Sequence, residues 1–455
     1  MTGSVQTFAY ARPSALHKTG GGRVLGLETA GGLTPVGAEE HPQFFAGFLT
    51  SPQAAARGLL AVADVAAARY YQATRPGLLD PVVTGNGDRL RFESFSGCCG
   101  VYARLDVLRD GLDGAETGHG TTNVDVNAPL REALSRITDG DPLHLRVGPD
   151  ELAVTTTDGQ VVEKKVKLPE RWLRGFAEAQ VVSAGFDLRA ELPAAEAVRF
   201  LRSLPRSSSA SRGAMWVVPA GRSLRLTARP GLGAVCLPGP ERLATLQQVL
   251  RHATRLRVFG PLPDGTAATA SAWELTLPGM RLTLTLSPEA GRGFSGEGGV
   301  LEALATDEAA EDAETVALLL SWEPRVDPMD LAERAGLTVA RVKAALTRLG
   351  TSGRVGYDIA DACYFHREMP YDTARAERHN PRLVAARNLV SAGAVRLDGA
   401  LAAVASGDVT HQVREHGGAL SCTCRWWADH RGRRGPCKHA LAVRIARRAV
   451  ADGTR

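Results

Sequence analysis

Short segments in which apolar and polar residues alternate fill the middle of the chain. Alternation of period two is typical of β-strands, because successive side chains point to opposite faces of a sheet. Short DGD, GPD and DG turns separate the segments, and one stretch of helical period, APLREALSRI at 128–137, interrupts them. The strands predicted in the first half of this region are LRFESF, VYARLDVL, PLHLRV, ELAVTTT and VVEKKVKL. The pattern predicts a strand-rich α+β region over 91–300.

The second half of that region repeats the first half's pattern of predicted strands interrupted by helices. Its predicted helices are AAEAVRFLRSL at 194–204 and ERLATLQQVLRHA at 241–253. Its predicted strands are FDLRAEL, MWVV, LRLTAR, LRVF, WELTL and RLTLTLS. A strand, a helix and several strands, twice over, resemble the two halves of a sliding-clamp domain of the processivity-factor class. The resemblance lies in the pattern alone.

Residues 1–90 form an N-terminal segment with a different pattern. The first fifty are rich in Gly and show little periodicity, which predicts loops and short strands. Within 52–72, Leu59, Val62 and Ala66 recur at helical spacing, so this stretch is predicted as one amphipathic helix.

An acidic, Ala-rich stretch at 302–314 separates the strand-rich region from a helical one at 311–370. The helical region opens on the apolar run TVALLLSW, which predicts a buried helix. A second helix is predicted after Asp327 as N-cap, with Pro328 at its first position and Gly336 just past its end.

A third helix begins at a threonine cap, and GRVGYDIADACYFHRE then predicts two short strands around a DIAD turn. Three helices and a hairpin in this order resemble the winged-helix class of helix-turn-helix domains. In DNA-binding members of that class, the third helix enters the major groove. The side chains that it would present outward are Arg341, Lys343, Thr347 and Arg348. The alternative is a winged helix used for packing or for protein contacts.

Composition places the chain among ordinary globular proteins. Its 455 residues suggest two to four domains, and 44% of them are hydrophobic and 23% charged. An apolar run near eighteen residues is lacking, so no membrane span is expected. The first residues lack the pattern of a secretory leader, so a cytoplasmic protein is expected.

Positive charge is concentrated near the C-terminus. Residues 414–455 carry ten Arg or Lys against three Asp or Glu, a surplus of seven, whereas the whole chain carries +5. Such a local surplus points to a polyanionic partner, and the alternative is a solvated arginine-rich face.

Three of the seven cysteines lie in the basic segment, in CTCRWWADHRGRRGPCKH. Cys422, Cys424, Cys437 and His439 follow the spacing C-x-C, twelve residues, C-x-H. A disulfide is rare in the cytoplasm and leaves the histidine without a purpose, and chance does not explain two close pairs. Zinc, which takes four sulfur or nitrogen ligands, is the remaining interpretation. Four protein ligands leave no position for a water, so one structural zinc ion per chain is expected.

This spacing, with CKHALAV after the gap, closely resembles the SWIM zinc-finger family over about 410–450. The resemblance implies a ββα finger with the four ligands just named, and a C-terminal domain over 380–455 that includes the preceding helix NPRLVAARNLVSAG. SGCCGVYARLD, GTTNVDVN and RGFSGEG are also similar to segments of bacterial SWIM-finger proteins. SWIM fingers are thought to bind DNA or proteins. Relatives of this bacterial type occur beside AAA-type ATPases and von Willebrand A-domain proteins, which implies a partner system.

Cations around the cluster are the candidate contacts to nucleic acid. They are Arg431, Arg433, Arg434, Lys438, Arg444, Arg447 and Arg448. His430 is an alternative zinc ligand, although we expect it to be exposed. Trp426 and Trp427 can stack on bases or pack against the finger, and packing is expected for at least one. The other cysteines, Cys98, Cys99, Cys236 and Cys363, are expected to be small buried apolar residues.

Motifs for catalysis are weak. The sequence has no G-x-x-x-x-G-K-[ST], H-E-x-x-H or G-x-S-x-G. GRGFSG at 291–296 matches G-x-G-x-x-G but lacks the following strand of a dinucleotide site, so a tight loop is expected. His119, Asn123 and Asp125 form a polar group that an alternating strand also explains.

The predicted protein is therefore α+β and multidomain, with a strand-rich N-terminal and central region, a winged-helix-like domain and a C-terminal ββα SWIM finger. We expect a zinc-stabilised binding or adaptor protein for nucleic acid or protein, and not an enzyme. The alternatives are an adaptor for the ATPase and von Willebrand A-domain system without DNA binding, and an enzyme with an unseen site in 90–290.

Overall fold

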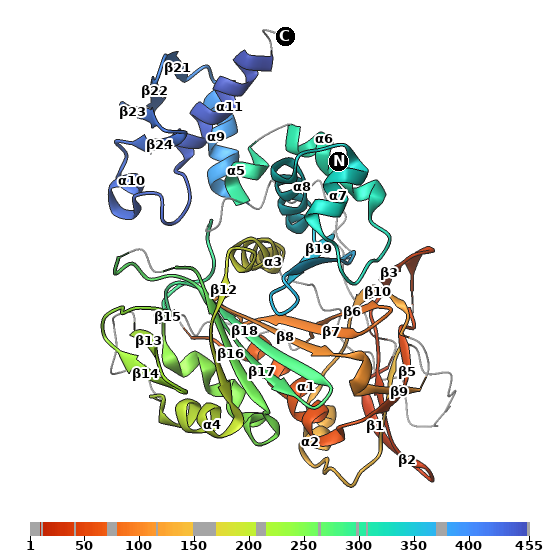
Figure 1. Ribbon diagram of the computed structural model, residues 1–455. Coiled ribbons are helices and arrows are strands. Elements are labelled where there is room, and N and C mark those ends of the chain that lie inside the picture. Colours follow the sequence, from red (N-terminus) through yellow and green to blue (C-terminus); the bar gives the residue numbers. More distant parts are fainter. Residues whose placement is uncertain are drawn as a thin grey trace.

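The chain forms a broad sheet-based body, with helices and a small C-terminal module lying above it (Figure 1). The structure, a computed structural model, describes residues 10, 12–40, 42–70, 80–114, 117–148, 170–205, 215–262, 265–296, 300–305, 308–369 and 380–452. The architecture is α+β, as predicted. The strands predicted at 151–157 and 161–168 lie outside the described residues.

A ten-stranded sheet forms the centre of the body. In spatial order its strands are β12 (Asp187–Pro193), β16 (Arg255–Gly260), β17 (Ser271–Leu277), β18 (Met280–Leu286), β8 (Val101–Val107), β7 (Leu90–Phe95), β6 (Val82–Asn86), β10 (His119–Asn123), β3 (Gly32–Thr34) and β4 (Gly37–Glu39). β18 pairs antiparallel with β8, from Met280 opposite Val107 to Leu286 opposite Val101. The two halves of the strand-rich region therefore share one continuous sheet.

One face of this sheet is apolar and rests on helix α1 (Pro52–Ala67), which contacts β7 and β8. Leu90, Phe92 and Leu105 lie fully buried in this core. The helix is shorter than the predicted 52–72. Twelve of its sixteen residues are buried, because neighbouring helices cover the side away from the sheet.

The opposite face of the same strands is polar, and it is buried as well. Arg91, Glu93, Arg104 and Asp106 alternate with the apolar residues and have at most 1% of their surface exposed. Alternation of this kind usually marks a sheet with one face in water. Here helix α3 (Glu170–Ser183) and a hairpin from the following domain cover the polar face (Figure 1). The sequence pattern did not predict α3.

A second, five-stranded sheet lies at one side of the body, on the right in Figure 1. Its strands, in spatial order, are β1 (Ala15–Thr19), β2 (Gly22–Leu27), β11 (Leu143–Val147), β5 (Phe45–Leu49) and β9 (Leu112–Gly114). Leu25, Leu27, Leu145 and Val147 point from it into the main core.

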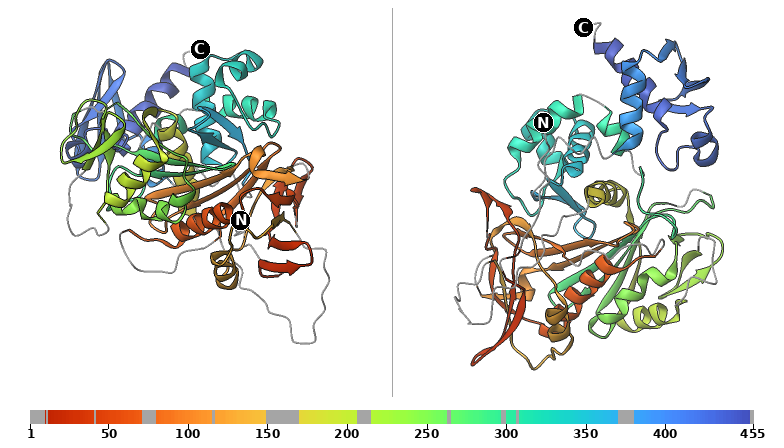
Figure 2. Two further views of the ribbon diagram at one scale, coloured as in Figure 1. Left: turned by 60° about the horizontal axis from the view of Figure 1, so that its bottom comes forward. Right: turned by 180° about the vertical axis from the view of Figure 1, so that it is seen from behind.

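Smaller elements complete the body (Figure 2). They are α2 (Ala128–Ser135), α4 (Ala194–Ser203), the 3-10 helices η1 (Arg109–Gly111), η3 (Pro240–Gln248) and η4 (Leu250–His252), and the sheet of β13 (Met215–Ala220), β14 (Ser223–Thr227) and β15 (Val235–Leu237). The stretch 241–253 is thus helical as predicted, but wound as 3-10 helix.

Three helices and a hairpin follow the body. They are α6 (Glu308–Leu319), α7 (Pro328–Ala335), α8 (Val339–Thr351), β19 (Val355–Asp358) and β20 (Cys363–His366). The predicted caps are confirmed, because the Asp327 side chain accepts from the amide of Met329, and Gly336 ends α7 in the left-handed conformation. Thr338 caps α8 in the same way. The hairpin extends down onto the polar face of the large sheet (Figure 1).

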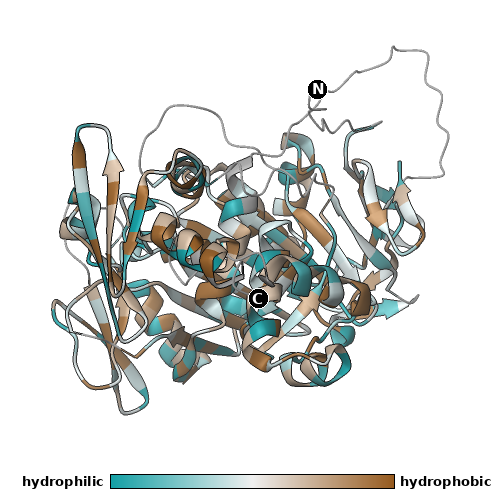
Figure 3. Cartoon of the chain, turned by 90° about the horizontal axis from the view of Figure 1, so that it is seen from above, coloured by the Kyte–Doolittle hydropathy of each residue, from teal (hydrophilic) through white to brown (hydrophobic). Residues whose placement is uncertain are grey.

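The C-terminal module combines a helix pair with a small sheet. Helices α9 (Pro381–Ser391) and α11 (Lys438–Asp452) pack together, and α5 (Val300–Leu304) packs against them. The sheet is a meander of β21 (Val395–Asp398), β22 (Leu401–Ser406), β23 (Val409–His416) and β24 (Ala419–Cys422), followed by α10 (Arg425–His430). Figure 3 shows hydrophilic and hydrophobic residues alternating along strands. In the described ranges, no helix is both long and apolar enough to cross a bilayer.

Candidate metal centre

Ordinary secondary structure brings the four predicted ligands together. Cys422 is the last residue of β24, and Cys424 is the N-cap residue of α10. Cys437 directly precedes α11, and His439 lies in the first turn of that helix. A strand end and two helix beginnings thus converge on one point.

The donor atoms of this cluster are close and shielded from water. One donor atom from each of Cys422, Cys424, Cys437 and His439 lies within 4.8 Å of all the others. Cys422 Sγ and His439 Nδ1 are 3.8 Å apart, and the four side chains are buried. Three sulfurs and one imidazole nitrogen suit a tetrahedral zinc ion, and four protein ligands leave no position for a reacting water. The site fits a structural metal ion.

The three thiols of the cluster differ in their pKa values. A hydrogen bond from Cys422 lowers the pKa of Cys437 to about 4, and the same hydrogen bond raises the pKa of Cys422. The amide of Ala440 also donates to Cys437 Sγ at 3.3 Å. Burial raises the pKa of Cys424. Binding of a divalent cation would release the protons that remain on these thiols.

The loop between the ligand pairs is held by aromatic contacts. The guanidinium groups of Arg382 and Arg434 lie 4.5 and 4.9 Å from the centre of the Trp426 ring. His430 packs on the same ring at 4.4 Å and is not part of the metal cluster. Trp427 lies against Gly432. Both tryptophans are half-buried, which agrees with packing.

The C-terminal module is seated on the body through the loop 291–296. Arg382 of α9 donates to the carbonyls of Arg434, Pro436 and Ser295, at 2.6, 3.0 and 3.0 Å. A side chain at Gly296 would overlap Arg382, and one at Gly435 would overlap the carbonyl of Gly296. Gly296 and Gly435 therefore allow two backbones to approach each other, which gives Gly296 of GRGFSG a packing role.

That same loop is anchored below by the segment SGCCG. The amide of Phe294 donates to the carbonyl of Cys99 at 3.0 Å, and the amide of Gly296 donates to Glu178 of α3 at 2.7 Å. Two of the segments that resemble SWIM-finger proteins thus contact each other.

The outward face predicted for the third helix, α8, is largely engaged within the chain. Arg341 pairs with Asp312 of α6 at 2.6 and 2.8 Å, and Thr347 is buried. Arg348 is half-buried and Lys343 is exposed. α3 and α5 pack against this helix, and Gln180 donates to the carbonyl of Leu346 at 3.1 Å.

The predicted cations of the C-terminal module divide into two groups. Arg431 and Arg433 are exposed in the loop between the ligand pairs. Arg447 pairs with Glu415 and donates to the carbonyl of Gly399 at 2.8 Å. The half-buried cations are Arg434, Lys438, Arg444, Arg447 and Arg448.

The remaining candidates take structural positions. Asp125 accepts from Asn127 at 3.1 Å and from the amide of Ser14 at 3.4 Å, while His119 is exposed at the start of β10. Asn123 is buried at the end of that strand. The cysteines outside the cluster are buried, except for the partly exposed Cys98. Burial raises the pKa of both Cys236 and Cys363 to about 11.

A buried ionic interface that the sequence did not predict joins the hairpin β19–β20 to the large sheet. Asp358 of the hairpin pairs with Arg91, Arg281 and Arg104 at 2.7, 2.9 and 3.0 Å. Asp361 pairs with Arg281 and Arg89 at 2.9 and 2.8 Å. The Arg91 guanidinium lies 3.9 Å from the centre of the Phe365 ring.

The charges of this ionic interface fix its protonation. Burial acts to raise the pKa of Asp358, but Arg104, Arg91 and Arg281 outweigh it and hold that pKa well below its usual value. Burial and the charge of Asp358 act to raise the pKa of Asp361, whereas its arginine partners lower it to about 2. Both carboxylates are therefore ionised at neutral pH.

Comparison with known proteins supports one assignment. Residues 414–447 match the family model of the SWIM zinc finger, and the metal cluster lies within the match. The chain thus carries a SWIM zinc finger near its C-terminus. No curated protein matches the chain. A solved structure, proliferating cellular nuclear antigen from Entamoeba histolytica, is similar over 55% of this chain and 100% of that chain, with 8% identity and a TM-score of 0.33. That score supports no inference, so the clamp-like character of 91–300 stays a prediction.

Proposed function

We propose that this chain is a zinc-stabilised nucleic-acid-binding protein whose SWIM finger contacts the phosphate backbone. The observation that carries the proposal is the exposed pair Arg431 and Arg433, placed between the ligand pairs in the segment with a surplus of seven positive charges. Cations that neutralise phosphates release counterions, which provides affinity without base recognition.

One zinc ion per chain gives this surface its shape. The ion would be held by Cys422, Cys424, Cys437 and His439, and it would fix the loop of Arg431 against α11. Its four protein ligands give it a structural and not a catalytic role.

The test is the salt dependence of DNA binding by the full-length, zinc-loaded protein. Replacing Arg431 and Arg433 together with Ala should weaken binding to all sequences alike and reduce the slope of log K against log salt by about two units. The matched control replaces Arg222 and Arg225, two exposed arginines of the hairpin β13–β14, and should leave the slope unchanged. An unchanged slope in the finger variant would refute phosphate contact by this loop.

We assign the domain 311–370 a packing role within this proposal. It resembles a winged helix in its order of elements, but its third helix is covered by α3 and α5 and its hairpin is held by the ionic interface. The cations Arg341, Lys343 and Arg348 are then secondary to those of the finger.

The second candidate is a protein adaptor, and exposed apolar residues favour it. Leu318 of α6 and Met329 of α7 are 87% and 70% exposed. The resemblance stated above implies an AAA-type ATPase or a von Willebrand A-domain protein as the partner. No DNA binding at about 50 mM salt, where non-specific electrostatic binding is strong, would favour this candidate over the first.

A further inference from the structure

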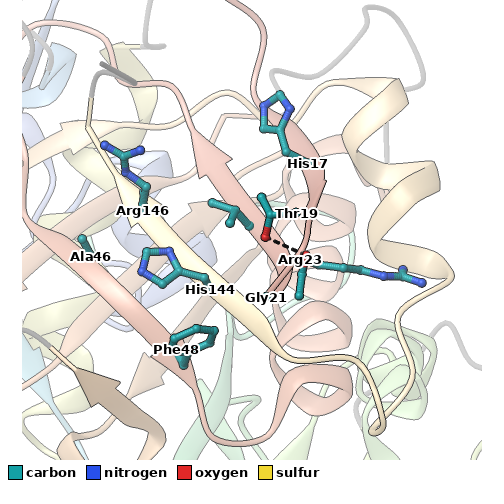
Figure 4. Close-up of a pocket in the computed structure, with 10 residues that line it drawn as sticks. His17, Thr19, Gly21, Arg23, Ala46, Phe48, His144 and Arg146 are labelled. Atoms are coloured by element: carbon teal, nitrogen blue, oxygen red, sulfur yellow. Dashed lines mark hydrogen bonds between the residues drawn. The ribbon is translucent and has the colours of Figure 1, made fainter. Parts of the chain in front are cut away.

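A hollow of about 420 Å³ lies on the face of the five-stranded sheet that points away from the core (Figure 4). Ten residues line it, and those that define its chemistry are His17, Arg23, Val24, Phe48, His144 and Arg146. Its volume is within the range of small-molecule sites. It lies at the end of the molecule opposite the finger (Figures 1 and 2).

Strand register builds the hollow from four strands. His17 of β1 is opposite Val24 of β2, which is opposite His144 of β11, which is opposite Phe48 of β5. These four residues form one row across the sheet and point to the same face. The depth comes from small residues beside the row, because Gly22 and Ala46 have little or no side chain.

Aromatic and apolar groups form the inner part of this hollow. Phe48 and His144 meet edge to face, with ring centres 5.0 Å apart. Phe48 keeps 42% of its surface exposed, an unusual position for a phenylalanine. Together with Val24 and Ala46, these rings offer a surface on which a flat ring can stack.

Two arginines, Arg23 and Arg146, lie beside this apolar surface. Arg146 and His17 lie on one side of His144, and the Phe48 ring lies on the other (Figure 4). Arg23 extends to the edge of the hollow, where Asp141 pairs with it at 3.1 Å. None of the ten lining residues is acidic. Arg146 therefore places a positive charge next to the stacking surface, where an anionic group of a ligand can pair with it.

His144 adds a further polar contact. Its Nδ1 is shielded from water and has no hydrogen-bond partner within the described residues. Because this nitrogen has no water-accessible surface, a ligand group reaches it only when the imidazole ring rotates, and that contact then removes the cost of an unsatisfied buried nitrogen.

The geometry points to a nucleotide site in this hollow, with the base against Phe48 and His144 and the phosphate beside Arg146. The same chemistry is present in a free nucleotide and in a single strand of nucleic acid. The site is separate from the finger and does not depend on its proposed function.

The test is calorimetric titration of the full-length, zinc-loaded protein with three kinds of probe. They are the four nucleoside monophosphates, inorganic phosphate, and an oligothymidylate of about 12 nucleotides, a length within the site size of one binding groove. Arg146→Ala should weaken nucleotide binding about tenfold, since it removes a charge-assisted hydrogen bond. Phe48→Ala should weaken it about fivefold or more by removing a stacking partner. Arg225→Ala, an exposed arginine on a strand of another sheet, should have no effect.

The pattern of binding separates the outcomes. A monophosphate that binds and competes with the oligonucleotide indicates a site for the free nucleotide and strand alike. The oligonucleotide is titrated into protein in which Arg431 and Arg433 are replaced by Ala, so that the finger does not contribute, and binding that is then lost only in the Phe48 and Arg146 variants indicates the strand. No binding of any nucleotide probe up to about 1 mM overturns the proposal. Two other results would also overturn it. One is inorganic phosphate that binds as tightly as the monophosphates and is unaffected by Phe48→Ala, and the other is nucleotide binding that all three variants retain.

Discussion

The SWIM finger and the hairpin β19–β20 are held in their native structures by different chemistry. The finger converges on four metal ligands and a small core that includes Val404, Val413 and Val443. The hairpin is joined to the sheet by carboxylates paired with four buried arginines. The fold of the finger depends on an ion supplied from outside, whereas the position of the hairpin depends on charges that belong to the chain. The two regions should therefore fail under different conditions.

The largest effect is expected from Cys437→Ser, which removes a ligand from a site whose binding free energy is of order 10–16 kcal/mol. The finger should unfold locally, and limited proteolysis should cut first within 405–452, while the large sheet stays protected. A chelator should act on the unmodified protein in the same way. Cys98→Ser, outside the cluster, is the control. Proteolysis of the large sheet at the same rate as the finger would contradict the separation of the two regions.

The next largest effect is expected from Asp358→Asn. It leaves Arg91, Arg104 and Arg281 without their shared carboxylate in a buried setting, which should lower the free energy of unfolding by about 3–5 kcal/mol. Denaturant unfolding measures the change, and zinc content should remain at one equivalent. Asp330→Asn, in an exposed ion pair with Arg334, should cost no more than about 1 kcal/mol. A loss of zinc from the Asp358 variant would show that the regions are coupled.

A smaller effect is expected from Gly296→Ala, at the contact between the finger and the body. The added carbon would overlap Nη2 of Arg382, and the φ of +82° disfavours a side chain. Displacement of Arg382 should cost about 1–3 kcal/mol and increase hydrogen exchange in the loop 431–436. Gly291→Ala meets no atom within 4 Å and serves as the matched control. Equal hydrogen exchange in the two variants would show that the contact between Gly296 and Arg382 does not hold the loop 431–436.

The smallest effect is expected from mild acid acting on the hairpin. The pKa of Asp361 is lowered to about 2 and that of Asp358 is also lowered, so both stabilise the fold above the unfolded value of about 3.9. This stabilisation is lost only as the pH falls through the folded pKa values. Fluorine NMR signals of fluorotyrosine at Tyr357 and Tyr364, assigned by replacing each with Phe, should stay in place from pH 7 to about pH 4. A transition near pH 6 would mean that other groups hold the hairpin.

Local signals in the sequence were sufficient for the caps at Asp327 and Thr338 and for the ligands Cys422 to His439. Each of these depends on residues close together in the chain, so spacing alone carries the information. The alternation in LRFESF and VYARLDV also identified strands correctly.

Contacts between segments far apart in the chain could not be predicted in the same way. Arg91 and Asp358 are 267 residues apart in the chain, and no local pattern links them. The contact of Gly296 with Gly435 is likewise a meeting of distant loops. The hollow at Phe48 depends on the parallel register of β11 with β2, which the sequence pattern does not specify.

The pairing of β8 with β18 also imposes an order on protein synthesis. Residues 101–107 leave the ribosome long before their partners at 280–286, and the carboxylate at 358 follows later still. Until then Arg91 and Arg104 of the nascent sheet have Asp106 as a partner but lack Asp358, and the sheet has an unpaired strand edge. Such features make folding intermediates prone to wrong contacts. Translation past residue 361 is therefore the earliest moment at which the body can reach its final, protected state.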